Sequence, residues 1–464
     1  MPPSVVTIGN GAGFLGDNLD APRRLVETAR LDYLTLEYLA ELTLSILARL
    51  REKDPHAGYA EDFLTVLQSL VPPMRAQPGL RLVTNAGGMN PLGCARRAAA
   101  ILSEAGLADV SLAVVTGDDL LPRLAELERA GCELTNLDTG QPLSSLHEEV
   151  VSANAYLGAG EIAAALADGA QMVITGRVAD ASLTVGPAMH HFGWRWDDWP
   201  RLAGASVAGH LIECGSQATG GFYSHWNEIE LADVGYPIAE IAEDATCVLT
   251  KPAGSGGRVN RETVTEQLVY EIGDPAHYLT PDVDLDFTTV EVDDLGGDRV
   301  AVRGTTGRPA PEQYKVSLTY RGGYFASGQM LCYGRDAVKK ARSCAAVVLA
   351  RLRAAGYDLD ESHVECLGAG EAVPGVPPPP ADLREVMLRL TVRDRRREAV
   401  ERFTREFAPL TTSGPAGLAG YASGRPQVRP VLAYWPALVP KELVSPRHET
   451  RSAAEWCQSA RGKQ

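Results

Sequence analysis

The sequence predicts an α/β protein, with a mainly parallel sheet domain over residues 1–260 and a following α+β domain of ferredoxin-like type over residues 280–445. Unbroken apolar runs, typical of strands buried on both faces, recur in the first part with helical segments between them. Strands that alternate apolar and polar residues begin at about residue 280. A chain of 464 residues is also too long for one ordinary domain.

The first domain is organised around AQMVITGRV and ADASLTVGPAMHHFGW, which together form residues 170–194. The first segment predicts a buried strand and the second a helix. The polar residues between them are Thr175, Gly176, Arg177, Asp180 and Ser182. Such a strand-to-helix junction is where α/β proteins bind anions. We expect Arg177 to bind the substrate and Asp180 to orient it, because a buried arginine needs a strong acceptor. The alternative is that the two residues only pair with each other.

At the N-terminus, a strand over 5–9 leads into a glycine-rich loop that ends in Asp17. Gly11, Gly13 and Gly16 match a dinucleotide-binding pattern, and Glu37 follows at the end of a strand over 33–37. The loop resembles the opening of extended short-chain dehydrogenases. However, Asp20 and Pro22 predict a late helix start, and no tyrosine is followed four residues later by lysine. Binding of NAD(P) is therefore the alternative, not the main expectation.

Further strands, turns and helices of the same kind follow. Helices are expected at 39–51, 61–70, 91–105, 120–130 and 149–168, and strands at 81–84 and 111–115. Asn85, Gly88 and Asn90 lie in the turn NAGGMNP, where glycine lets backbone approach a ligand and a new helix offers free N–H groups. A tight turn with an asparagine cap is equally consistent. Asp138 lies in a similar loop, so we expect loops 10–17, 85–90, 136–140 and 176–182 to form one rim.

His210, Glu213 and Cys214 share one helical face because they are spaced three and four residues apart. A histidine and a glutamate at this spacing can act as general acid and base or bind a metal, and a core-facing cysteine beside a satisfied histidine is the alternative. Trp194, Trp196 and Trp199 are expected to pack in the interior. Lys251 precedes the loop PAGSGG and could bind a phosphate or carboxylate, or simply face solvent.

The second domain begins with a hairpin, 288–293 and 299–303, around Gly296-Gly297. Strands are then expected at 315–320, 328–333, 364–367 and 386–392, with helices at 335–355 and 396–407. This order of strands and helices predicts the ferredoxin-like type. The Pro-rich segment 373–380 predicts a rigid connection. Residues 446–464 are expected to fray.

The composition of the chain limits the classes of molecule that it is expected to bind. A net charge of −15 disfavours nucleic acid and anionic membranes, which leaves a small anionic molecule as the expected ligand. The eight cysteines show no paired spacing, so neither a disulfide framework nor a zinc site is expected. No signal peptide or long apolar segment is present in the sequence, which predicts a cytoplasmic protein, and we expect a homo-oligomer.

Several segments resemble the acyclic terpene utilisation (AtuA) family. They are IGNGAGFLGDNLDA, LDYLTLEYLAELTL, NAGGMNP, VSANAYLGAGEIAAALADGAQMVITGRVADASLTVGP, AGHLIECGSQATGG, VGYPIAEI and WPALVPKELV. The resemblance covers nearly the whole chain. It implies an α/β main domain followed by a ferredoxin-like domain, and a place in the catabolism of branched acyl-CoA intermediates. The high Arg and Ala content and the length of 464 residues without an appended small domain leave open a recruited biosynthetic role. It implies no particular mechanism.

The sequence thus predicts an enzyme, a hydro-lyase or C–C lyase, that works next to the carbonyl of an acyl-CoA or carboxylate without a redox cofactor. A nicotinamide-dependent oxidoreductase and a non-catalytic acyl-binding or accessory subunit are the alternatives. His210 and Glu213 are the first candidates for proton transfer, with Asp180 and Arg177 beside them. The expected substrate-binding residues are Gly11, Gly13, Asp17, Asn85, Gly88, Asn90, Asp138, Gly176, Ser182 and Lys251. No metal site is assigned, although Asp17, Glu37 and Asp138 offer oxygen ligands to a divalent ion.

Overall fold

The computed structural model describes residues 5–39, 41–373, 375, 382–420 and 424–461. The chain divides into two compact units. The first comprises Met1–Leu146, Val151–Leu318 and Trp435–Gln464, and the second comprises His147–Val150 and Thr319–Tyr434.

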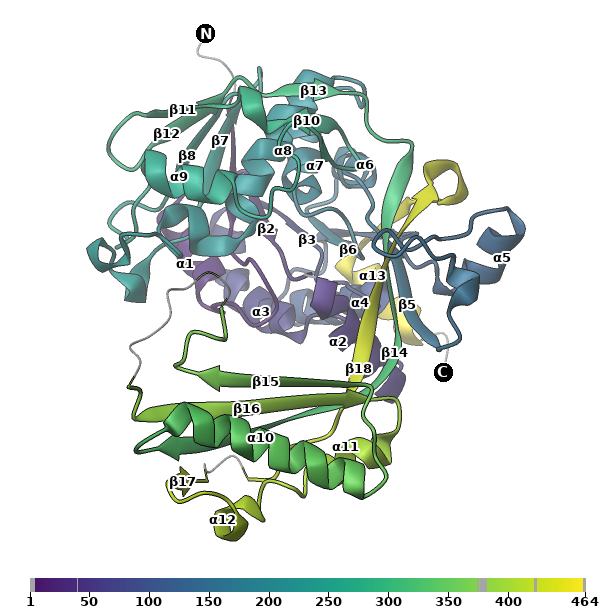
Figure 1. Ribbon diagram of the computed structural model, residues 1–464. Coiled ribbons are helices and arrows are strands. Elements are labelled where there is room, and N and C mark those ends of the chain that lie inside the picture. The colour runs from purple at the N-terminus through teal and green to yellow at the C-terminus, as the bar shows by residue number, and fades with distance from the viewer. Residues whose placement is uncertain (1–4, 40, 374, 376–381, 421–423, 462–464) are drawn as a thin grey trace. The chain divides into compact units, whose positions relative to one another are not determined.

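A large mixed sheet forms the centre of the first unit (Figure 1). Within the described residues its strands are, in sheet order, β11 (Glu291–Asp294), β12 (Val300–Arg303), β8 (Cys247–Thr250), β7 (Ile238–Ala242), β1 (Val5–Asn10), β2 (Tyr33–Leu36), β3 (Arg81–Thr84), β6 (Met172–Thr175), β4 (Ser111–Thr116) and β19 (Arg447–Ser452). Only the neighbours from β1 to β4 pair in parallel, through β2, β3 and β6. The remaining pairs are antiparallel.

The prediction of a mainly parallel sheet is therefore wrong for the flanks of this sheet. Strands β7 and β8 are joined by a short turn, and β11 and β12 by the predicted turn at Gly296 and Gly297, both of which have positive φ. Connections this short can only join antiparallel strands. The parallel strands lie where helical crossovers connect them, as the unbroken apolar runs indicated.

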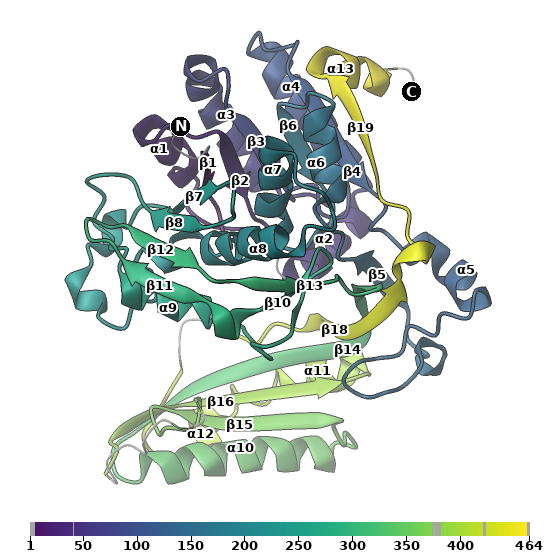
Figure 2. The ribbon, with the colours of Figure 1, turned by 90° about the horizontal axis from the view of Figure 1, so that it is seen from above.

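Helices cover both faces of the sheet in the first unit (Figure 2). The helices of this unit are α1 (Ala21–Thr28), α2 (Glu41–Lys53), α3 (Glu61–Ala76), α4 (Pro91–Glu104), α5 (Leu124–Arg129), α6 (Gly160–Ala167), α7 (Ser182–Phe192), α8 (Trp199–Glu213), α9 (Arg261–Leu268) and α13 (Ala453–Arg461), of which α5 lies away from the sheet. Helices α1, α3, α4 and α13 share one apolar core with the strands. Helices α7 and α8 contact β1 from the opposite face, which places the end of α8 near the carboxyl ends of the parallel strands.

The segment 149–168, predicted as one helix, contains β5 (Val150–Ala155) followed by α6. Strand β5 pairs with β14, and long-range pairing of this kind overrides the weak helical spacing of its alanines. The expected fraying after residue 446 also differs from the structure. Strand β19 extends the sheet beside β4, and Trp456 of α13 is buried against α4.

A small sheet of β9 (Tyr278–Leu279), β10 (Asp284–Asp286) and β13 (Thr306–Arg308) belongs to the first unit. The boundary between the units therefore lies near residue 319, not 280. The hairpin β11–β12 alternates because it joins the antiparallel flank of the large sheet through β8. The change of pattern at 280 marks the edge of a sheet and not the end of a unit.

In the second unit, strands and helices alternate. They are β14 (Gln313–Tyr333), α10 (Ala337–Ala354), β15 (Glu361–Leu367), β16 (Glu385–Asp394), α11 (Arg397–Phe403), α12 (Leu410–Ser413), β17 (Leu418–Ala419) and β18 (Arg429–Pro440). The sheet order is β15-β16-β14-β17, with antiparallel pairs, and β18 also pairs with β14. Strand β14 begins in the first unit, and strand β18 ends in it. The strands expected at 315–320 and 328–333 are one long strand, β14. The Pro-rich segment lies mostly outside the described residues.

Among the helices of the described ranges, none has the length and apolar character needed to span a membrane.

Candidate active site

A cavity of about 480 Å³ lies within the first unit, beside the carboxyl end of β6. Its size is in the range of small-molecule sites. It is lined by Leu137, Tyr156, Arg177, Ala179, Asp180, Ala181, His210, Glu213, Glu271, Tyr278, Leu279, Thr280, Pro281, Pro311, Gln313, Tyr314, Lys315 and Leu438. The four residues that the sequence suggested for catalysis are all among them.

The side chain of Arg177 is almost fully buried, with 1% of its surface exposed. Its Nη1 lies 3.0 Å from Oδ1 of Asp180 and donates a hydrogen bond to the carbonyl of Leu39. The guanidinium carbon lies 4.0 Å from the centre of the Tyr156 ring. The pairing of Arg177 with Asp180 is thus present, and these contacts hold the guanidinium in one orientation at the cavity wall.

Asp118 supports the backbone of Arg177 from behind. Its Oδ2 accepts hydrogen bonds from the backbone N of Arg177 (2.8 Å) and from Nδ2 of Asn154 (2.9 Å). Burial raises the pKa of Asp118 to about 6. Gly176 packs directly on the Asp118 carboxylate, where a Cβ atom would overlap it, so this glycine is required for packing and does not line the cavity.

His210 and Glu213 lie one turn apart on α8, with His210 Nδ1 3.4 Å from Glu213 Oε1. The other imidazole nitrogen, Nε2, lies 2.9 Å from the carbonyl oxygen of Gln267. The side-chain amide of Gln267 donates in return to the carbonyl of His210 at 3.0 Å. Since a carbonyl only accepts, Nε2 must carry the proton, and Nδ1 presents its lone pair to Glu213.

Burial acts in opposite directions on the two groups. It lowers the pKa of His210, and it raises the pKa of Glu213 well above its usual range, with the negative charge of Asp180 adding to the effect on Glu213. Both directions favour an uncharged imidazole beside a protonated carboxyl group. Such a pair can exchange a proton between its members and with a bound molecule.

Sequence reasoning did not identify most of the residues that line the cavity, among them Tyr156, Glu271, Tyr278 and Lys315. The Tyr156 ring contacts Arg177 and also lies 5.1 Å from Nζ of Lys315, so two cations meet at one aromatic ring. Glu271 has φ of 58°, an uncommon conformation for a residue with a side chain. These residues come from separate segments, and no local pattern identified them.

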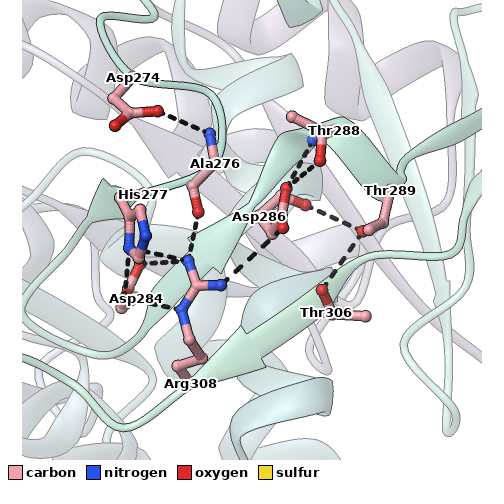
Figure 3. A network of polar contacts seen from close by, with 9 residues as sticks. All are labelled: Asp274, Ala276, His277, Asp284, Asp286, Thr288, Thr289, Thr306 and Arg308. Carbon is pink, nitrogen blue, oxygen red and sulfur yellow. Dashed lines mark hydrogen bonds and ion pairs between the residues drawn. The ribbon is translucent and has the colours of Figure 1, made fainter.

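A polar network next to the cavity joins β10, β13 and the segment before β9 (Figure 3). Arg308 of β13 donates to both carboxylate oxygens of Asp284, at 2.9 and 3.1 Å, and to the carbonyl of Ala276. Asp286 accepts from Thr288 in the same network. The arginine thereby ties β13, which precedes Pro311 and Lys315, to the segment that enters β9 and carries Tyr278. Bidentate pairs of this kind give fixed geometry.

Glu37 and Asn85 lie in the interior and do not line the cavity. Nδ2 of Asn85 donates to Oε1 of Glu37, and Oδ1 of Asn85 accepts from the backbone N of Tyr38 at 2.8 Å. Leu39 N also donates to Glu37 at 2.7 Å. Burial raises the pKa of Glu37 well above its usual range, and the negative charge of Asp180 raises it further. Both side chains therefore shape the backbone that Arg177 binds.

The glycine-rich loop 10–17 packs against the end of α8. A Cβ on Gly13 would overlap the backbone of Cys214 and Gly215, and Gly13 N donates to Asp17 at 2.8 Å. Asp17 also accepts from the Tyr236 hydroxyl at 2.5 Å. In dinucleotide-binding loops this glycine lets a pyrophosphate approach, but here the protein's own backbone fills that space. Gly13 and Asp17 thus pack against the end of α8, whereas Gly11 packs on Pro22 and Leu36.

The remaining predicted binding residues also lie outside the cavity lining. Asn90 caps α4 by accepting from Gly93 N at 3.0 Å, and Gly88 packs on Leu47 with positive φ. Asp138 is exposed in its own loop. Ser182 donates to Asp282 at 2.5 Å. Lys251 donates to the carbonyl of Ser255 at 2.8 Å and lies 3.2 Å from Asp298.

Of the four loops, 136–140 and 176–182 contribute to the cavity lining, through Leu137 and through Arg177, Ala179, Asp180 and Ala181, and the loops 10–17 and 85–90 contribute no lining residue. The structure brings Arg177, Asp180, His210 and Glu213 together and gives the other residues supporting contacts. The three residues that offered oxygen ligands to a divalent ion have different surroundings. Asp17 binds Tyr236, Glu37 is buried beside Asn85, and Asp138 is exposed in its own loop. In the part of the chain that the structure describes, no group of three or more histidine, cysteine, aspartate or glutamate side chains is arranged to hold a metal ion.

The fold and this cavity define a mixed α/β protein with a buried acid–base pair next to a fixed arginine. The chain belongs to the acyclic terpene utilisation family, because the profile described as "Acyclic terpene utilisation family protein AtuA" matches residues 6–450, nearly the whole sequence. No significant match was found among curated proteins or among solved structures.

Proposed function

We propose that this chain is an enzyme that acts on a branched acyl-CoA or carboxylate, and that it adds or removes water or breaks a C–C bond next to the carbonyl. The observation that carries the proposal is the placement of His210 Nδ1 3.4 Å from Glu213 Oε1 at a cavity that two cations, Arg177 and Lys315, also line. The raised pKa of Glu213 favours its protonated form and supports a role in proton transfer. Membership of a family named for acyclic terpene utilisation supports a branched substrate.

The proposed roles follow from position. Arg177 and Lys315 attract the anionic or carbonyl end of the substrate to the wall around Tyr156. When the Glu213 proton moves to Nδ1 of His210, the carboxylate that remains can remove a proton from the carbon next to the carbonyl. Arg177 stabilises the negative charge that develops on the carbonyl oxygen. Glu213 then gives the proton taken from carbon to the leaving hydroxyl or the leaving carbon, and the proton held on His210 Nδ1 returns to Glu213.

Asp180 has a positioning role in this scheme. It lies 3.0 Å from Arg177 and raises the pKa of Glu213 through its charge. It therefore orients the cation and also favours the protonated state of the acid. No step uses a metal or a nicotinamide.

The proposal extends to the cellular location, the oligomeric state and the fold type of the second unit. We propose a cytoplasmic homo-oligomer, with the second unit ferredoxin-like. The order β14-α10-β15-β16-α11-β17 and the sheet order β15-β16-β14-β17 support the description of the second unit.

Equilibrium binding separates the proposal from its alternatives. Branched acyl-CoA esters should bind, and NAD(P)H should not. Turnover of β-hydroxylated or α,β-unsaturated esters should then be lost in Glu213→Gln while binding remains. Tight binding of NAD(P)H would favour the oxidoreductase. Binding without turnover, with activity restored by a co-encoded protein, would favour an accessory subunit.

A further inference from the structure

A second cavity, also of about 480 Å³, lies in the first unit and is mainly apolar. We call it the apolar groove; its apolar lining includes Met189, Trp196, Trp199, Leu202, Pro309 and Tyr314. Trp194 is buried and stacks on Phe192, in line with the packing role expected for the tryptophans. Trp196 departs from that expectation, because it is 71% exposed and contacts Trp199 edge to face at 5.9 Å. An exposed tryptophan in an apolar hollow is typical of a binding surface.

Three of the charged side chains that line the groove, Asp282, Lys441 and Glu161, are bound by the protein. Asp282 accepts from Ser182 and, at 2.8 Å, from the backbone N of Ala159. Nζ of Lys441 donates to the carbonyl of Pro281 at 2.7 Å. Glu161 lies 2.7 Å from His448. With these groups engaged, the apolar side chains form most of the surface left for a ligand, which favours a hydrocarbon occupant.

The groove shares a wall with the candidate active site. Pro281, Pro311 and Tyr314 line both cavities. The two cavities therefore adjoin at these three residues, and a chain that passed over them from Arg177 and Glu213 would meet Trp196 and Trp199.

We propose that the apolar groove is the subsite for the hydrocarbon chain of the substrate, which is then a carboxylate or thioester with a chain long enough to leave the candidate active site. This proposal rests on the proposed function. Each methylene that enters the groove contributes about 0.8 kcal/mol, so affinity should increase roughly fourfold per added methylene until the groove is full.

The test is calorimetric titration of the full chain with straight and methyl-branched alkanoates of increasing length. In the wild type, affinity should rise with chain length and then level off. In Trp196→Ala the increase per methylene should become clearly smaller, because one face of the groove is lost. Trp226→Ala is the matched control, since Trp226 is 63% exposed and does not line the groove.

A second variant fills the groove. A Cβ on Gly160, which lines the groove, meets no atom within 4 Å, so a side chain can start at this position, and Gly160→Leu adds an isobutyl group to the groove lining. Affinity in this variant should level off at a shorter chain, whereas Gly160→Ala should behave like the wild type.

The outcomes are distinct. A chain-length dependence that is the same in the wild type, Trp196→Ala and Gly160→Leu would overturn the groove assignment, and short alkanoates that still bind would leave the proposed function standing. No binding of any alkanoate or of its CoA ester would overturn both.

Discussion

Nδ1 of His210 lies 3.4 Å from Oε1 of Glu213, and both side chains are buried on one face of α8. Burial lowers the pKa of the histidine and raises that of the glutamate, and both directions favour the uncharged forms. This arrangement underlies the proposed chemistry.

Loss of either member should remove proton transfer. In His210→Asn and Glu213→Gln, kcat should fall by roughly 100-fold to 10,000-fold, the usual contribution of general acid–base catalysis, with the folded structure retained. Steady-state kinetics and circular dichroism measure both. His363→Asn, at a site that is 72% exposed, should have no effect. Near-normal rates in both variants would remove the assignment.

Asp118 should make stability depend on pH. The native state keeps its proton up to about pH 6, whereas the unfolded chain releases it near the ordinary value of 3.8. This contribution is therefore complete below 3.8 and is lost as pH rises through 6, by about 3 kcal/mol at most.

Asn at this position can still accept from Arg177 N and Asn154, but it cannot titrate. Relative to the wild type, Asp118→Asn should therefore gain in unfolding free energy as pH rises from about 4 to about 6. Denaturant titrations at several pH values measure this difference, with Asp119→Asn as the neighbouring control. A difference that does not change with pH would mean that Asp118 is already ionised throughout.

Arg177 should not be replaceable by lysine. Arg177→Lys keeps the charge but cannot bind Leu39, Asp180 and the ligand with one planar group. Affinity for an acyl-CoA or carboxylate ligand should drop roughly 10-fold to 100-fold, which corresponds to one lost charged hydrogen bond. Arg195→Lys, at a position 77% exposed, is the control. Unchanged affinity would make Arg177 purely structural.

The loop 10–17 should be required for the position of α8. Gly13→Ala forces a Cβ into the backbone of Cys214 and Gly215, at an expected cost of about 1–3 kcal/mol. Thermal unfolding tests this, and the rate should fall as well because Glu213 moves with the helix end. Gly79→Ala, where a Cβ meets no atom within 4 Å, should be nearly neutral. Equal effects of the two substitutions would contradict the packing role.

The sequence alone predicts the parts of the site that depend on residues close to one another in the chain. Arg177 follows a short apolar strand, and His210 and Glu213 are three residues apart on a helix, so both features could be identified without tertiary information. Tyr156 and Lys315 could not, because they meet only when the segment after β5 bonds the start of β14, with Tyr156 N donating to Lys315 O at 2.9 Å.

The glycine-rich loops were interpreted as ligand-binding loops for a related reason. A glycine that admits a ligand and a glycine that admits neighbouring backbone have the same sequence pattern, and only the fold shows that Gly13 meets Gly215. The antiparallel flanks of the large sheet were missed because the pairing of β12 with β8 links strands about fifty residues apart.

Hydrogen–deuterium exchange at carbon tests the central claim most directly. The protein is incubated in D₂O with CoA thioesters of branched saturated, β-hydroxylated and α,β-unsaturated acids, and deuterium next to the carbonyl is measured by mass spectrometry. We expect exchange or product labelling at that carbon in the wild type, and its loss in Glu213→Gln with ligand binding retained. Deuterium incorporation that proceeds equally in Glu213→Gln, or its absence from every thioester that binds, would contradict acid–base chemistry by the His210–Glu213 pair.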